Sequence, residues 1–179
     1  MRTIYLAGGC YWGVEKYLAS LRSVVATEVG FANGNTAHPS YEQVKHENTG
    51  HAETVRVDYD EQALPLRALL RLFFRIIDPV SVDQQGHDVG HQYRTGIYWT
   101  DAADEATVRE ELGRLQEQVG QPLAVEAQPL EHFYSAEEYH QKYLDKNPGG
   151  YCHVPWEMIR WAQGIDPVQE VMGEPSQSA

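Results

Sequence analysis

Apolar positions alternate with polar ones at the two-residue spacing of a strand in several short segments. The clearest are residues 25–31 and 55–59, where β-branched or aromatic residues (valine, threonine, phenylalanine and tyrosine) stand at every second position. The predicted strands are residues 3–7, 25–31, 55–59, 95–100 and 123–127. Because one face of an alternating strand is apolar, we expect these strands to form a sheet that is covered on that face.

Helical spacing of apolar residues separates the predicted strands. Residues 11–21, 65–77 and 101–119 have this pattern, and it is strongest after Pro65, where apolar residues recur at i, i+3, i+4, i+7 and i+11. Two capping boxes predict further helices, one over residues 41–46 and one from Ser135 through Leu144. Strands and helices in this order predict an α+β fold, a two-layer sandwich in which helices cover a mixed β-sheet with a ferredoxin-like core.

The composition restricts the partners that the chain is suited to bind. Its 179 residues suit one domain, and 14 basic against 26 acidic side chains give a formal net charge of −12. This charge argues against nucleic acid and against an anionic membrane as partners. The sequence has no apolar run of membrane-spanning length and no recognisable signal peptide, so we expect a cytoplasmic protein, and we expect a monomer.

Two cysteines, Cys10 and Cys152, are too few for a disulfide scaffold or for a zinc site made of several thiolates. Cys10 follows Gly8 and Gly9 between a predicted strand and a predicted helix, where free N–H groups and the helix dipole favour a thiolate of lowered pKa. The alternatives are a buried structural thiol at Cys10, a bystander at Cys152, or a binding module stapled by a disulfide between them.

A long loop over residues 78–93 is the second candidate site region, because loops of this length in compact domains are usually functional. Its segment His87-Asp88-Val89-Gly90-His91 resembles a zinc hydrolase motif, which requires a helix to bring both imidazoles to one face. Gly86 and Gly90 weaken a helix here, and Asp88 stands where that motif has its glutamate base.

Three local motifs occur together in the chain: Gly-Gly-Cys-Tyr-Trp-Gly at 8–13, Gly-His-Ala-Glu at 50–53, and Gln-Gly-His-Asp-Val-Gly-His-Gln-Tyr-Arg at 85–94. In this order and at this spacing they resemble the A-type peptide methionine sulfoxide reductases. The similarity extends from about Arg2 to His153. It implies a catalytic domain over residues 1–153 and a C-terminal extension over 154–179, whose last residues we expect to be disordered.

The resemblance implies a role for each matching residue in the reduction of methionine-S-sulfoxide. Cys10 matches the nucleophile, which becomes a sulfenic acid as methionine leaves. Glu53 matches the proton donor to the sulfoxide oxygen, Tyr41 and Tyr93 match the tyrosines that hydrogen-bond this oxygen, and Asp88 matches the acidic residue that orders the cluster.

The same resemblance assigns Tyr11 and Trp12 to binding the apolar end of the substrate, and Cys152 to resolving the sulfenic acid as a disulfide with Cys10. We expect Cys152 to lie in a flexible glycine-rich segment that swings toward Cys10. The implied partners are oxidised proteins and free methionine sulfoxide as substrates and thioredoxin as reductant, with dithiothreitol as a substitute. No metal and no other cofactor are expected.

Overall fold

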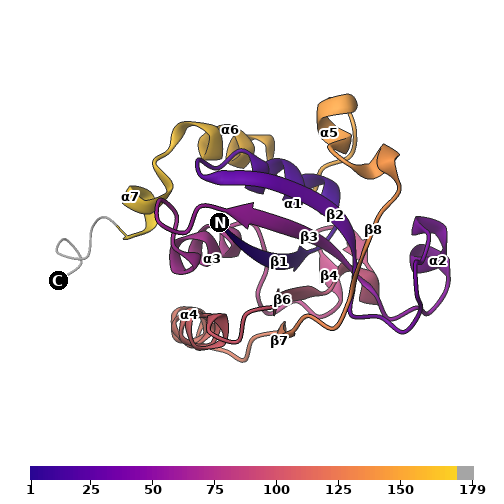
Figure 1. The fold of residues 1–179 in the computed structure, drawn as a ribbon, viewed down its shortest axis with the longest axis horizontal. Helices are drawn as coiled ribbons and strands as arrows, with labels where there is room; N and C mark the ends of the chain where they lie inside the picture. The colour runs from indigo at the N-terminus through magenta and orange to yellow at the C-terminus, as the bar shows by residue number, and fades with distance from the viewer. Residues whose placement is uncertain (173–179) are drawn as a thin grey trace.

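A six-stranded mixed sheet forms the centre of the molecule in the computed structural model, which describes residues 1–172 (Figure 1). Its strand order is β7-β6-β1-β3-β2-β8; every neighbouring pair is antiparallel except β6 and β7, which are parallel. The strands are β1 (Arg2–Gly8), β2 (Val24–Ala32), β3 (Ala52–Tyr59), β6 (Thr95–Trp99), β7 (Val125–Pro129) and β8 (Phe133–Ser135). The mixed sheet that the sequence predicts is confirmed.

The central four strands and two helices follow one another as β1, α1 (Tyr11–Ala19), β2, β3, α3 (Leu66–Phe74) and β6. In the sheet these strands lie in the order β6-β1-β3-β2. This β-α-β-β-α-β succession is that of a ferredoxin-like motif. The ferredoxin-like core stays a prediction, which the strand order supports.

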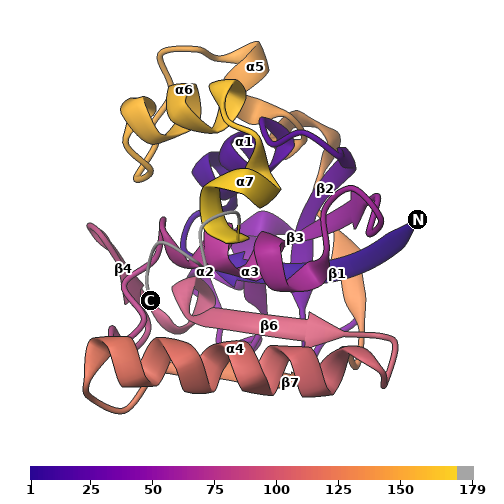
Figure 2. The same cartoon turned by 90° about the vertical axis from the view of Figure 1, so that its left-hand side faces the viewer.

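Helices α1 and α3 cover one face of the sheet, where the main core lies. Ile4 and Leu6 of β1 point into this core, whereas Tyr5 and Ala7 belong to a smaller apolar cluster on the other face. Such alternation follows from the two-residue repeat of a strand. Helix α4 (Asp104–Val119) runs along β6 and β7 at one edge (Figure 2).

Most predicted elements are present with slightly shifted ends. Ser40 and Gln43 form the predicted capping box at the start of α2 (Tyr41–His46), and Gly120 ends α4 in the left-handed conformation. The predicted loop over 78–93 contains two-residue strands, β4 (Gln84–Gln85) and β5 (Asp88–Val89), followed by a 3-10 turn, His91–Tyr93.

The predicted helix from Ser135 through Leu144 is wrong. The chain instead forms β8, a 3-10 turn (Glu138–His140) and the short helix α5 (Tyr143–Lys146). Gln141 explains the break, because its side-chain amide bonds both the N–H and the carbonyl of Val29 at 2.8 Å. Lys142 then takes a positive φ of 52°, and its N–H donates to the buried Glu15 carboxylate at 2.9 Å. These contacts to α1 and β2 override the local capping signal.

The C-terminal part of the chain folds back over the helices of the main core. Helix α6 (Trp156–Gly164) contacts α1, and α7 (Pro167–Met172) contacts α3 (Figure 2). We expected the last residues of the chain to be disordered. Residues 173–179 lie outside the described part of the structure, so this expectation stays a prediction. Among residues 1–172, no helix has the length and apolar character that crossing a bilayer requires.

Candidate active site

Cys10 occupies the junction between β1 and α1, as the glycine pair predicts. Gly9 has a φ of +91°, which glycine adopts without strain, and Cys10 is the residue immediately before the first turn of the helix. The side chain is a free thiol and is only 8 % exposed. The turn therefore holds the sulfur at the helix N-terminus, but beneath the surface.

Glu53 lies beside this thiol as the second residue of β3, paired with Phe31 of β2. Its side chain is 1 % exposed and accepts two hydrogen bonds, from the Tyr11 N–H at 3.3 Å and from Gln92 Nε2 at 3.2 Å. Burial raises the pKa of the carboxyl to about 8, although both hydrogen bonds act in the opposite direction. At pH 7 most molecules therefore carry Glu53 in its neutral, proton-donating form.

The expected low pKa of the Cys10 thiol is wrong for this structure. Burial, and next the charge of Glu53, raise the pKa of the thiol well above its ordinary value. A hydrogen bond from the backbone at Trp12 acts in the opposite direction and does not compensate. Because a buried anion next to another anion is unfavourable, Cys10 and Glu53 favour a state in which both hold their protons.

Tyr41 and Tyr93 lie near Cys10 and Glu53, although they come from α2 and from the 3-10 turn before β6. Burial raises the pKa of each phenol, and the charges of Glu53 and Cys10 raise it further. Both therefore keep their O–H groups as donors at neutral pH. We call these four residues the acid cluster.

Asp88 contacts the segment that contains Cys152 rather than Tyr41 or Tyr93. One of its carboxylate oxygens accepts a hydrogen bond from the Tyr151 hydroxyl at 2.9 Å. Its charge contributes to the raised pKa values of Glu53 and Cys10, so it is close to the acid cluster. The predicted ordering role of Asp88 is thus accompanied by a contact that the sequence motifs did not indicate.

Cys152 is half-buried, has a free thiol and lies against the first turns of α1. Its Sγ is 3.0 Å from the carbonyl oxygen of Val154, and partial burial raises its pKa. Its neighbours Tyr151 and His153 hydrogen-bond Asp88 and Gly8, and the expected flexibility of this segment stays a prediction.

The two aromatic residues after Cys10 have different surroundings. Tyr11 is 1 % exposed and packs in the core against Phe31, and its hydroxyl has no hydrogen-bond partner among the described residues. Trp12 is half-buried, its indole N–H donates to His140 Nδ1 at 3.1 Å, and its ring stacks on that of Tyr143, 3.7 Å away and inclined by only 7°. Their roles as substrate contacts stay predictions.

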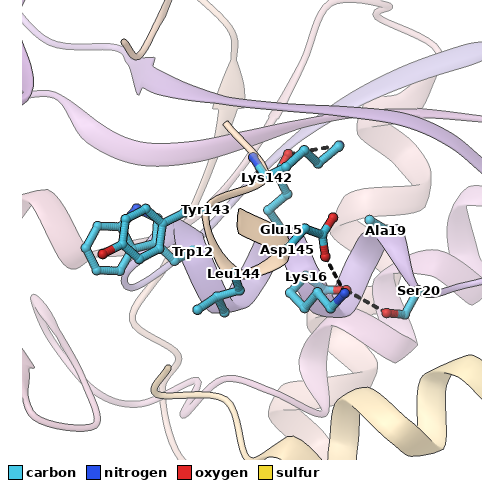
Figure 3. A pocket seen from close by; sticks show the side chains of 9 residues that line it. All are labelled: Trp12, Glu15, Lys16, Ala19, Ser20, Lys142, Tyr143, Leu144 and Asp145. Atoms are coloured by element: carbon cyan, nitrogen blue, oxygen red, sulfur yellow. Dashed lines mark hydrogen bonds and ion pairs between the residues drawn. The ribbon is translucent and has the colours of Figure 1, made fainter. Parts of the chain in front are cut away.

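A pocket opens beside this stacked pair, between α1 and α5. Figure 3 shows the Tyr143 ring lying over Trp12 at one end and the ion pair of Lys16 with Asp145 at the other. Trp12 is the one predicted site residue that lines the pocket, and no residue of the acid cluster lines it. The other lining residues had no predicted role, so the sequence did not indicate this pocket.

Three residues that sequence reasoning gave no role contact the predicted site residues: Gln92, His140 and Tyr151. Gln92 is within the recognised motif and could have been found as a donor to Glu53. His140 and Tyr151 contact residues that are 128 and 63 positions away, so no local pattern could have indicated these contacts.

The alternative of a zinc site at His87 and His91 is not supported. Asp88 and Val89 are extended and Gly90 has a φ of +150°, so the helix that this motif requires is not formed. Within residues 1–172, no group of three or more histidine, cysteine, aspartate or glutamate side chains is placed to hold a metal ion.

The arrangement thus consists of a buried thiol, a carboxyl of raised pKa and two phenols. Residues 2–166 match the family model described as peptide methionine sulfoxide reductase. The chain belongs to this family. As a peptide methionine sulfoxide reductase it is an oxidoreductase acting on sulfur. The peptide methionine sulfoxide reductase MsrA of Lachnoclostridium phytofermentans is 56 % identical over 153 residues, which are 86 % of this chain and 92 % of that protein.

Two solved structures of the yeast protein Mxr1 also resemble this peptide methionine sulfoxide reductase. The reduced form of Mxr1 from Saccharomyces cerevisiae has a TM-score of 0.80 and 40 % identity, covering 84 % of this chain and 88 % of that one. Mxr1 in complex with Trx2 has a TM-score of 0.57 and 26 % identity, covering 79 % and 84 %.

Proposed function

We propose that this enzyme reduces methionine-S-sulfoxide, both in proteins and as the free amino acid, through a Cys10 sulfenic acid and a Cys10–Cys152 disulfide that thioredoxin reduces. The observation that carries the proposal is the juxtaposition of Cys10 with a buried Glu53 whose pKa is raised to about 8. A nucleophile that removes oxygen from sulfur needs such an acid, because the oxygen is a poor leaving group until it is protonated.

In the first step Glu53 donates its proton to the sulfoxide oxygen while Cys10 Sγ attacks the sulfoxide sulfur, and the thiol proton of Cys10 passes to the Glu53 carboxylate. The hydroxyl group then moves with its electron pair from the substrate sulfur to Cys10 Sγ, and methionine leaves with both electrons of the S–S bond that the attack formed. The products are methionine and a Cys10 sulfenic acid that bears the transferred proton. The sulfur of the substrate is reduced by two electrons and that of Cys10 is oxidised by two.

Tyr41 and Tyr93 support this step as donors. Both phenols are protonated at neutral pH, since even an exposed phenol is protonated there and burial raises the pKa of these two further, and both are near Cys10 and Glu53. They can hydrogen-bond the sulfoxide oxygen as negative charge develops on it, which stabilises the transition state. Asp88 acts on the cluster through its charge, and Tyr11 and Trp12 bind the methyl group and thioether.

In the second step Cys152 attacks the sulfenic acid and releases water. Thioredoxin then reduces the disulfide by thiol exchange. The complex of yeast Mxr1 with Trx2 supports thioredoxin as the partner. We propose in addition that the enzyme is a cytoplasmic monomer and works with no cofactor besides this reductant.

The test offers each sulfoxide epimer separately to the enzyme with thioredoxin, thioredoxin reductase and NADPH. NADPH oxidation with the S epimer, matched by methionine formation, is the expected result. Reduction of the R epimer at a similar rate would refute the stereochemical assignment. Turnover with dithiothreitol but not with thioredoxin would refute the proposal that thioredoxin is the reductant.

A further inference from the structure

Both chain neighbours of Cys152 are anchored by hydrogen bonds to other parts of the molecule. The Tyr151 hydroxyl donates to Asp88 of β5 at 2.9 Å. His153 Nε2 is 3.0 Å from the carbonyl oxygen of Gly8, the last residue of β1. Cys152 lies between these two anchors and is therefore held at the level of the helix that carries Cys10.

Two glycines, Gly9 and Gly13, make room for the segment Tyr151–His153. A Cβ placed on Gly13 would lie 2.9 Å from Cys152 Sγ and 3.2 Å from the Cγ2 methyl of Val154. A Cβ placed on Gly9 would lie 3.1 Å from His153 Nε2. The absence of a side chain at Gly13 thus gives Cys152 its place on α1, one turn from Cys10.

We propose that Cys152 is docked for attack before Cys10 is oxidised, and that Tyr151 is a positioning residue for disulfide formation. This inference rests on the proposed function, since it concerns the second step. In that step Cys152 Sγ bonds to Cys10 Sγ, the S–O bond of the sulfenic acid breaks, and the hydroxide leaves as water with the proton of the Cys152 thiol. Docking removes the need to order the segment during this reaction.

Tyr151 suits a test because its hydroxyl bonds no residue of the acid cluster. Its side chain is 44 % exposed, and its hydroxyl donates to Asp88 rather than to Glu53 or Tyr41. Removing the hydroxyl frees one anchor of the segment and leaves both hydrogen bonds to Glu53 in place. The effect should therefore fall on disulfide formation and spare methionine formation.

The experiment mixes reduced enzyme with one equivalent of the S sulfoxide and no reductant. Methionine is measured by rapid quench, free thiols are counted over the same times, and dimedone traps the sulfenic acid. In Tyr151→Phe we expect methionine to form within twofold of the wild-type rate. The loss of free thiols should slow by about tenfold, because the variant loses the free energy of one hydrogen bond to a carboxylate. The sulfenic acid should then persist, and the dimedone adduct should accumulate on Cys10.

A second variant tests the place that Gly13 provides. Gly13→Ala should also slow the loss of thiols relative to methionine formation, because its methyl group meets Cys152 Sγ. Gly149→Ala is the matched control: it changes a glycine three residues before Cys152, where a Cβ meets no other atom within 4 Å. We expect wild-type behaviour from this control.

The ratio of the two rates distinguishes positioning from general damage. A merely structural defect would slow both steps together, and this outcome would overturn the role of Tyr151. Disulfide formation at the wild-type rate in Tyr151→Phe or in Gly13→Ala would overturn the inference while leaving the proposed function intact. Failure of the wild type to form methionine would overturn both.

Discussion

The two cysteines lie close together but in surroundings that differ in almost every physical respect. Cys10 is 8 % exposed at the start of a helix, beside a carboxyl whose pKa is about 8. Cys152 is half-buried in an irregular segment that is docked by a few polar contacts. One site is built into the sheet and helices, and the other is attached to their surface.

This difference suits the two steps that we propose. The first step requires a proton donor that is still protonated at pH 7, and a carboxyl meets this requirement when burial raises its pKa. The second step requires a thiol that is already beside Cys10 and that afterwards forms a disulfide open to another protein. A segment docked on the surface meets both requirements, because few contacts have to break for another protein to reach the disulfide.

The largest expected effect comes from exchanging each sulfur for oxygen. Cys10→Ser should reduce methionine formation by about 10³ or more, because the nucleophile is lost. Cys152→Ser should form one methionine per molecule at the wild-type rate and then stop with thioredoxin as the reductant. A rapid-quench assay measures methionine formation by both variants. Equal amounts of methionine from the two variants would contradict the separate roles of Cys10 as nucleophile and Cys152 as resolving cysteine.

Glu53→Gln should have the next largest effect, because a general acid contributes roughly 10² to 10⁴ in rate. The Tyr11 N–H and Gln92 Nε2 donate to different oxygens of Glu53, so the amide keeps one of these two hydrogen bonds, and we expect the fold to persist. Single-turnover methionine formation at pH 7 measures the loss. Full activity of this variant would refute the proton-donor assignment.

The same variant should change the pH dependence of stability. The pKa of Glu53 is about 8 in the folded state against 4.5 ordinarily, so between these values the folded state holds one more proton than the unfolded state. The wild type therefore loses unfolding free energy with rising pH, by up to about 1.4 kcal/mol per pH unit, relative to Glu53→Gln. Urea unfolding of both proteins from pH 5 to 9 measures the difference; parallel curves would contradict the raised pKa.

The Cys10 thiol should titrate at lower pH when Glu53 is neutralised. Above about pH 8 the wild-type carboxylate is charged and raises the pKa of Cys10, whereas the amide introduced by Glu53→Gln carries no charge. Thiolate absorbance at about 240 nm in a Cys152→Ser background follows this titration, with and without Glu53→Gln. A titration midpoint of the Cys10 thiol that is unchanged or higher in Glu53→Gln would contradict a contribution of the Glu53 charge to the raised pKa.

The smallest effect concerns Tyr11, whose buried hydroxyl has no partner among the described residues. Tyr11→Phe removes a polar group that is buried without a hydrogen bond and should raise the unfolding free energy by about 1 kcal/mol. Urea unfolding at pH 7 checks this. A loss of stability instead would mean that the hydroxyl has a partner in solution.

Sequence alone predicted the site around Cys10 better than the site around Cys152. The glycine turn and the alternation in β3 place Cys10 and Glu53 locally, and their motifs identify the family. The pKa of Cys10 could not be predicted, because its burial depends on how α1, β3 and the 78–93 loop meet. The helix start predicted at Ser135 failed because Gln141 and Lys142 contact β2 and α1, which no local pattern shows.

The most direct test of the central claim is the mass of the Cys152→Ser variant after one turnover. The variant is mixed with excess methionine-S-sulfoxide without reductant, and the methionine released is compared with the oxygen gained by each peptide. We predict one methionine per molecule and one oxygen atom on the peptide that contains Cys10. Methionine formed without oxygen on Cys10, or oxygen found on another residue in its place, would contradict the account.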